Sequence, residues 1–232
     1  MYVVKRPQSL RSQAIVQIRQ AIVTGRLAPN SMHSEQSIAA GMSISRTPVR
    51  EALLQLATEG LVEFVPQRGV RVTELNADLL GNVFQFRSAI ESYCAAVLAA
   101  HPRKDVLAAL DVTLSRQEDI IDADDHLRWV EANMEFHTIL VRSAGNPLLD
   151  QTLASLASHS MRISYRMIAR KARMQESLAE HRAIYEAIRR RDQDRARSLT
   201  AEHLYVCTLL MNQMFSDLPS ERSREREPDA EA

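Results

Sequence analysis

The sequence predicts a mainly α-helical protein in two parts: a small helical head with a β-hairpin, and an antiparallel all-helical bundle of about six helices. Three observations support this prediction. The 232 residues are enough for two hydrophobic cores. Four of the six glycines precede residue 75, so turns are concentrated in the first third. Residues 1–75 carry nine basic and five acidic side chains against 20 and 24 in the remainder, which indicates parts with different partners.

The composition excludes several classes of protein. Hydrophobic residues make up 45% of the chain and charged residues 25%, which excludes disorder of the whole chain. No apolar run reaches the ~18 residues that a membrane span requires, and no signal peptide opens the sequence. Cys94 and Cys207 lie in helical apolar patterns, which favours reduced core residues over a disulfide. We therefore expect a cytoplasmic protein without a membrane partner.

Two helices are predicted at the start of the chain. Apolar residues recur at helical spacing over 10–22, and Gly25 provides the C-terminal stop. A turn follows, and a second, short helix fits residues 35–41. Ser34 is its predicted N-cap, because a serine oxygen at that position accepts a hydrogen bond from the first turn.

A third helix and a hairpin complete the predicted head. Either Ser45 or Thr47 caps this helix, Pro48 lies in its first turn, and Gly60 ends it. The runs LVEFV and VRVTE then flank the turn PQRG, and the alternation in the second run is typical of a ribbon with one buried face. Helix, short helix, turn, helix and hairpin is the order of a winged helix-turn-helix. We assign residues 1–75 to this domain.

The polar residues of the head are placed for reading DNA. Arg46, Thr47 and Arg50 lie at the exposed start of the third helix, and a recognition helix enters the major groove with its N-terminal end first. Arg68 and Gly69 lie at the hairpin tip, where a wing reaches the DNA backbone or the minor groove. The alternative is that these arginines only solvate a small helical domain.

The rest of the chain reads as a bundle of helices. Caps and breaks divide it into six segments joined by short connections, which favours antiparallel neighbours. A charged tail with very few apolar residues, 216–232, is predicted to be disordered. The predicted domain covers 76–215, with helices over about 76–100, 103–122, 125–144, 146–170, 174–191 and 192–215.

Three of these helices turn a histidine toward the interior. His181 lies within the apolar stripe of the fifth helix, and Asn133 precedes His137 by one turn in the third. His203 lies within the stripe expected for the last helix, which comprises Ala196, Leu199, His203, Val206 and Leu210. A single histidine on an apolar face is usually a hydrogen-bonded core residue. Three unpaired imidazoles in one core are costly, and convergence on a divalent metal removes that cost. Imidazole suits Zn, Ni, Cu or Fe, and the Asn133 oxygen and water can complete the shell.

The first third of the chain resembles a known family. The segment GRLAPNSMHSEQSIAAGMSISRTPVREALLQLATEGLVEFVPQRGVRV is similar to the DNA-binding domain of GntR-family bacterial transcription regulators, and SRTPVREAL followed by EGL and RG is specific to it. The resemblance implies contacts to operator DNA from the recognition helix and the wing. With the helix cap added, the predicted DNA-binding set is Ser34, Ser45, Arg46, Thr47, Arg50, Arg68 and Gly69.

The remainder resembles the FadR-type C-terminal ligand-binding domain of the same regulators, through FQFRSAIESYCAAVLAA, NMEFHTIL, AGNPLL, EHRAIYEAI and AEHL. In the metal-binding branch of that domain, an Asp or Asn four residues before a His joins two later histidines around a divalent cation. The matching positions are Asn133, His137, His181 and His203. Asp is the commoner first ligand, so Asn133 removes a negative charge from the site.

The resemblance also implies an effector cavity. An arginine at the position of Arg87 often faces that cavity and pairs with a carboxylate ligand, and Arg162 and Tyr165 are further candidates. The residues alone leave another interpretation open, in which Arg87 and Glu91 form an ordinary ion pair on a helix surface.

The sequence therefore predicts a homodimeric transcription regulator, usually a repressor, with two heads that read half-sites about one helical turn apart. A small organic acid bound near a divalent metal ion controls its affinity for operator DNA. Two alternatives remain: a metalloenzyme that acts on a small carboxylic acid, and a regulator whose metal ion is purely structural.

Overall fold

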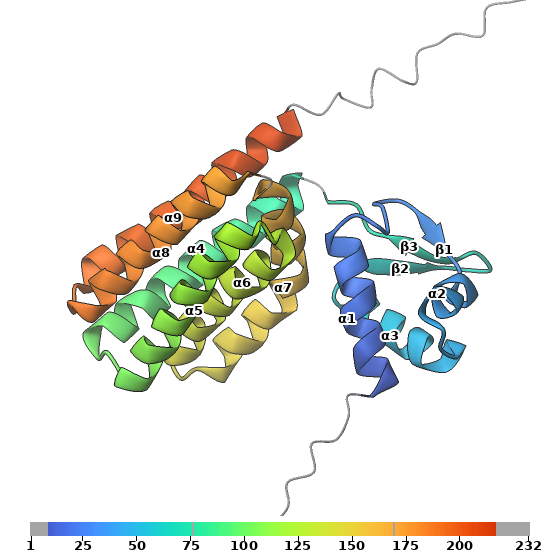
Figure 1. Cartoon of the computed structure of the whole chain (residues 1–232), viewed down its shortest axis with the longest axis horizontal. Helices are drawn as coiled ribbons and strands as arrows, with labels where there is room; N and C mark the ends of the chain where they lie inside the picture. Colours follow the sequence, from blue (N-terminus) through green and yellow to red (C-terminus); the bar gives the residue numbers. More distant parts are fainter. Residues whose placement is uncertain (1–8, 76, 169, 217–232) are drawn as a thin grey trace, which may run out of the picture.

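The computed structural model describes residues 9–75, 77–168 and 170–216, and within them the chain forms nine helices and three short strands (Figure 1). The mainly helical fold class is confirmed. The elements of the head are α1 (Leu10–Val23), β1 (Met32–His33), α2 (Glu35–Met42), α3 (Arg46–Thr58), β2 (Val62–Val65) and β3 (Gly69–Val72). The bundle consists of α4 (Ala77–Ala100), α5 (Lys104–Ala123), α6 (His126–Ser143), α7 (Pro147–Met167), α8 (Lys171–Arg189) and α9 (Gln193–Ser216).

Local signals explain how the helices of the head begin and end. The Ser34 side chain accepts a hydrogen bond from the backbone N–H of Ser37, so the predicted cap of α2 is confirmed. Ser43 ends α2 in the left-handed conformation, with φ of 54°, and turns the chain into α3. Of the two candidate caps for α3, Ser45 is the one in extended conformation, and Thr47 lies in the first turn.

The wing contains one strand more than the sequence indicated. β2 and β3 form the predicted antiparallel hairpin, with Val62 opposite Val72 and Val65 opposite Gly69. β1 pairs with the other edge of β3, which gives the strand order β1-β3-β2. Two residues are too few to show alternation, so β1 left no signal in the sequence. This sheet closes the core of the head over the apolar faces of α1 and α3.

The six predicted helices of the bundle are all present. Their bounds agree to within a few residues, with α8 beginning at Lys171 instead of residue 174. The short connections pack them as a bundle, in which α4 lies along α9 (Figure 1). Aromatic side chains such as Trp129 and Phe136 of α6 are completely buried in its main core.

The stripe expected for the last helix, Ala196, Leu199, His203, Val206 and Leu210, is partly wrong. His203 and Ala196 are buried, but the other three are only partly covered. The buried side chains in their place are Thr200, Leu204, Cys207 and Met211. The reason is that α9 packs against both α4 and α8, so its buried strip follows the line between these two helices.

A polar cluster joins the head to helix α7 of the bundle. The Arg19 guanidinium donates two 2.8 Å hydrogen bonds to the carboxylate of Glu59. Ser158 of α7 donates to the same carboxylate at 2.6 Å and accepts from Arg19 Nε at 3.1 Å. A second link runs from Arg162 of α7, which donates to the carbonyl oxygen of Thr73 at 2.8 Å. The orientation of the head is therefore tied to α7.

The structure does not test two of the predictions, the domain boundaries and the disordered tail. The boundaries of the two domains stay predictions, although separate apolar cores lie on the two sides of residue 75. The predicted disordered tail falls on residues 217–232, outside the described part of the chain, apart from Ser216, which ends α9. Within the described residues, no helix has the length and apolar character needed to cross a membrane.

We predict that Gly69→Ala destabilises the protein. Gly69 has φ of +111°, a conformation that side chains rarely adopt, and an added Cβ would collide with the carbonyl oxygen of His33 in β1. The free energy of unfolding in urea should fall by about 2 kcal/mol or more. Gly41→Ala is the matched control, because an added Cβ there meets no atom within 4 Å, and it should be neutral or slightly stabilising. Equal stability of the two variants would contradict this account of the wing.

Candidate metal centre and DNA-reading surface

A groove of about 430 Å³ lies where the starts of α2 and α3 meet the hairpin tip. Arg46 and Arg50 line it from α3, Ser34 lies at the start of α2, and Arg68 and Gly69 lie at the tip. The structure thus brings five of the seven predicted DNA-binding residues to one groove. The other two, Ser45 and Thr47, are exposed beside Arg46 at the start of α3.

The arginines of this groove are available to a partner. The side chains of Arg46 and Arg50 are 66% and 63% exposed, and both reach the carboxylate of Glu35, at 3.5 and 3.0 Å. Ion pairs this exposed contribute little stability. A phosphate or a base edge can therefore replace Glu35 as their partner at small cost.

The groove is also lined by residues outside the predicted DNA-binding set. Gln36 lines its wall, Phe64 presents a 39% exposed ring from β2, and Gln67 occupies the hairpin tip with φ of 62°. Of the last two residues, only Gln67 could have been placed in the groove from the sequence, because it lies in the turn between the two predicted strands. An exposed Phe on a strand looks the same in sequence as a core Phe.

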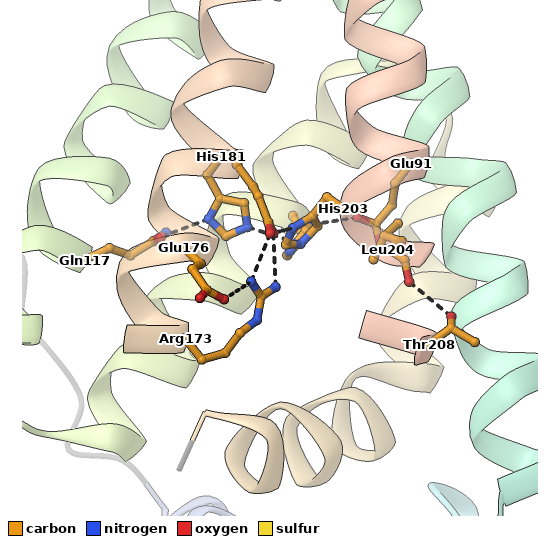
Figure 2. A network of polar contacts seen from close by, with 10 residues as sticks. Glu91, Gln117, Arg173, Glu176, His181, His203, Leu204 and Thr208 are labelled. Atoms are coloured by element: carbon orange, nitrogen blue, oxygen red, sulfur yellow. Dashed lines mark hydrogen bonds and ion pairs between the residues drawn. The ribbon is translucent and has the colours of Figure 1, made fainter. Parts of the chain in front are cut away.

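In the bundle, the three predicted histidines converge, and Figure 2 shows two of them, His181 and His203, close together. His137 comes from α6, His181 from α8 and His203 from α9, and all three are buried. One ring nitrogen of each lies within 4.8 Å of those of the other two. Phe136 stacks on His181 with ring centroids 4.4 Å apart and closes one side of the cluster. The geometry is that of three ligands around one point.

Carboxylates orient two of the imidazoles through hydrogen bonds at Nδ1. Nδ1 of His137 lies 2.6 Å from Oε2 of Glu91, and Nδ1 of His203 lies 2.5 Å from Oε2 of Glu180. An ionised carboxylate only accepts hydrogen bonds, so each Nδ1 carries the proton. In the neutral form of either ring, Nε2 then carries no proton and can act as a ligand.

The third imidazole is held in the same way by an amide. Nδ1 of His181 lies 2.9 Å from Oε1 of Gln117 (Figure 2), while the Gln117 amide nitrogen donates to the carbonyl oxygen of Ala132 at 3.3 Å. That second bond fixes which end of the amide faces the ring. Nε2 of His181 therefore also lacks a proton, and it lies 3.4 Å from Nε2 of His203.

The electrostatics keep both acids ionised and favour the neutral forms of His137 and His181, whose pKa values burial lowers. Burial would raise the pKa of Glu91, but Arg87 and His137 lower it to about 2. Burial would likewise raise the pKa of Glu180, which hydrogen bonds from His203 and Arg173 lower to about 2. Burial lowers the pKa of His137 to about 4 although Glu91 acts in the opposite direction. Neutral imidazole is the form that binds metals.

A cavity of only about 20 Å³ adjoins the cluster. Asn133 and Arg87, both predicted site residues, line it together with His137 and His203. Nε of Arg87 donates to Glu91 Oε1 at 2.6 Å, and both side chains are at most 2% exposed, so the surface ion-pair interpretation is wrong. Nη2 of Arg87 is buried and has no hydrogen-bond partner among the described residues.

The structure does not bring the other two effector candidates to this cavity. Arg162 is buried at the junction with the head, bound to Thr73. Successive residues of an α-helix are about 100° apart, so Arg162 projects from the side of α7 opposite Ser164, which does line the cavity. Tyr165 packs at the edge of the main core. Their role in effector binding stays a prediction.

Two family models match the chain. Residues 10–72 match the model described as bacterial regulatory proteins, gntR family, and residues 82–205 match the FCD domain.

The chain belongs to the GntR family. It is a DNA-binding transcriptional regulator of the helix-turn-helix type with a FadR-type C-terminal domain, as the resemblance implied.

Two of its relatives are transcriptional regulators that align with this chain over most of their length. An HTH-type transcriptional regulator in an unstable DNA locus of Streptomyces ambofaciens is 31% identical over 226 residues, which cover 94% of this chain and 88% of that protein. The HTH-type transcriptional repressor RspR of Escherichia coli (strain K12) is 28% identical over 197 residues, 85% of this chain and 86% of that protein.

Among solved structures, E. coli McbR/YncC is similar to this chain, with a TM-score of 0.77 and 20% sequence identity. The match covers 90% of this chain and 100% of that chain. At this identity the likeness shows the fold alone. The GntR arrangement of a winged head and a helical bundle is thus shared.

We predict that Glu91→Gln strongly destabilises the metal-free regulator. The variant leaves the Arg87 charge buried without its partner, and such losses cost about 3–5 kcal/mol. Glu118→Gln is the control: its ion pair with Arg182 is half exposed, so the change should be about 0.5 kcal/mol or less. Urea unfolding of both variants at neutral pH measures the difference.

The same substitution should change the response to acid. The folded-state pKa of Glu91, about 2, lies below its ordinary value of 4.5. Its stabilising contribution is therefore complete above the unfolded-state pKa and is lost as the pH falls from about 4.5 to about 2. The free energy of unfolding of Glu91→Gln should decline less over this range than that of the native protein. An equal decline would contradict the buried charge pair.

Proposed function

We propose that this GntR regulator is a homodimeric repressor, not an enzyme, whose affinity for operator DNA is controlled by a small organic acid bound beside a divalent metal ion. The observation that carries the proposal is the convergence of three buried imidazoles, each with a hydrogen bond at Nδ1 and with one ring nitrogen of each within 4.8 Å of those of the other two. The repressor function of the E. coli relative supports the direction of regulation.

The residues fit a metal ion. Without a cation, the lone pairs of His181 Nε2 and His203 Nε2 face each other across 3.4 Å, which is repulsive. Zinc–imidazole bonds of about 2.0–2.1 Å at tetrahedral angles place two ligand nitrogens about 3.3–3.4 Å apart. His137 and the Asn133 carboxamide complete the predicted ligand set, which suits Zn or Ni. Bound there, the ion acts as a Lewis acid toward an anionic oxygen.

The charge balance favours an anionic effector. Glu91 is paired with Arg87, and Glu180 is paired with Arg173 at 2.9 Å, so these four side chains cancel. Imidazole binds a cation in its neutral form and Asn133 carries no charge, so these ligands leave the two charges of a divalent ion uncompensated. The buried Nη2 of Arg87 also lacks a partner. A carboxylate satisfies both needs, because it accepts hydrogen bonds from guanidinium and binds the cation.

The two alternatives make different demands on the site. A metalloenzyme needs a free general base, but the carboxylates beside the cluster, Glu91 and Glu180, are both engaged by a histidine and an arginine. A purely structural ion needs no effector and leaves Nη2 of Arg87 without a function. In the sensor proposal, the two glutamates orient two of the histidines and Nη2 of Arg87 binds the effector.

For DNA binding, we propose that the groove of the head contacts the operator through Ser34, Ser45, Arg46, Thr47, Arg50, Arg68 and Gly69. Arg46→Ala should weaken binding to an operator selected from genomic fragments by about 1–3 kcal/mol, as expected for loss of a bidentate base contact. Arg11→Ala removes the same charge from the exposed face of α1 and is the control. Fluorescence anisotropy at fixed salt, against operator and scrambled duplex, measures both. Unchanged discrimination in Arg46→Ala contradicts the assignment of the recognition helix.

For the metal, we predict one zinc per chain by elemental analysis of protein reconstituted after chelation. His181→Ala should abolish binding, whereas His101→Ala, at an exposed position, should retain it. Gln117→Ala should lower the affinity about 10- to 100-fold, because Gln117 orients His181. Full zinc occupancy in His181→Ala would refute the site.

The same preparations distinguish a sensor from a structural ion. A carboxylic acid should bind the zinc-loaded protein and release it from operator DNA, and it should lose that effect in the metal-stripped protein. Equal affinity for the acid with and without zinc would assign the ion a structural role only.

A further inference from the structure

A second, larger hollow lies beside the small cavity. It is a cleft of about 460 Å³ between the end of α7, the start of α8 and the last turns of α9. Three arginines and one glutamate line it, together with the apolar side chains of three other residues: Arg166, Arg170, Arg173 and Glu176, then Met167, Leu210 and Met214. Its charge is therefore positive and its walls are partly apolar, which suits a small organic anion.

Two of these arginines are available. Arg166 and Arg170 are exposed, and within the described residues neither side chain makes a hydrogen bond or ion pair. Arg170 is also the N-cap of α8 and provides no side-chain cap, so the first N–H groups of that helix add to the positive potential. An anion in the cleft gains from both sources.

Arg173 differs, because it is buried and already paired. It donates to Glu180 at 2.9 and 3.0 Å and to Glu176 at 3.3 Å. Figure 2 shows its guanidinium extended toward Glu176, with His181 and His203 just beyond. Both of its present partners are carboxylates, so an incoming carboxylate can take the place of either without leaving the guanidinium unpaired.

Arg173 also separates the two spaces. Arg173 and Met167 line both the cleft and the 20 Å³ cavity beside His137 and His203. A volume of that size holds about one water molecule or ion and no organic acid. An acid can reach Arg87 only when these two side chains, a flexible thioether and an exchangeable guanidinium, move aside and join the spaces.

We propose that the cleft is the outer half of the effector site and that the effector is a short dicarboxylate. Its inner carboxylate is bound by Arg87 and the metal ion, and its outer carboxylate is bound by Arg166 and Arg170. Arg173 lies between these two groups, and it gives up its ion pair with one glutamate to bind the ligand instead. This inference rests on the proposed function and adds the class of the effector and the route by which it enters.

The test uses the full-length, zinc-loaded protein and isothermal titration at matched ionic strength. The probes are three pairs of acids of equal length: succinate and butyrate, glutarate and pentanoate, adipate and hexanoate. At least one dicarboxylate should bind about tenfold or more tightly than its monocarboxylate partner. Arg166→Gln/Arg170→Gln should lose that preference while its monocarboxylate affinities change less than about twofold. The zinc content is measured after each titration to exclude removal of the metal.

Two controls separate the conclusions. Arg195→Gln/Arg197→Gln removes two exposed charges from the start of α9, away from the cleft, and should bind like the native protein. Arg87→Gln should weaken both members of every pair. The inference is overturned if the native protein shows no preference for dicarboxylates, or if that preference persists in Arg166→Gln/Arg170→Gln. In either case, a loss of binding in Arg87→Gln still supports the proposed function. If no acid of either series binds, the organic-acid proposal itself fails.

Discussion

The bundle depends on one constraint: charged and polar groups buried at its centre must all find partners. His137, His181 and His203 come from α6, α8 and α9, and the groups that hold them come from α4, α5 and α8. Five of the six bundle helices are therefore connected through hydrogen bonds of the cluster. Removing any partner leaves a desolvated charge or dipole, which is more costly than losing an apolar contact. The same network fixes the orientation of the three imidazoles in the proposed metal site.

Helix α7 contacts both the cavity beside the histidines and the head. On one side, Ser164 and Met167 line the cavity beside the histidines. On another, Ser158 and Arg162 hold Glu59 and Thr73 of the head. A ligand that moves α7 relative to the rest of the bundle therefore acts directly on the orientation of the winged domain. Thermodynamic reciprocity then requires operator DNA to change the affinity for the ligand by the same factor.

The distribution of charge has a structural counterpart. A chain with 29 basic and 29 acidic residues has no net charge, yet the head is basic. The fold places Arg46, Arg50 and Arg68 of the head around one groove. The bundle, although acidic as a whole, collects Arg166, Arg170 and Arg173 at one cleft. Local fields of this kind, more than the net charge, decide which anions a surface attracts.

The sequence by itself determined the helices, the hairpin and the histidines that gather inside the bundle. Helical periodicity, caps such as Ser34 and breaks such as Gly60 are local signals, so they gave nearly every boundary. The convergence of three histidines followed from their shared place on inward faces.

What only the tertiary structure decided depends on contacts between distant segments. These are the pairing of β1 with β3, the burial of Arg87 with Glu91, and the face of α9 that meets α4 and α8. Arg162 belongs to the same group: its side chain binds Thr73, 89 residues away along the chain. Spacing along one helix shows which residues share a face, but not which neighbour covers that face. That choice belongs to the packing of the whole molecule.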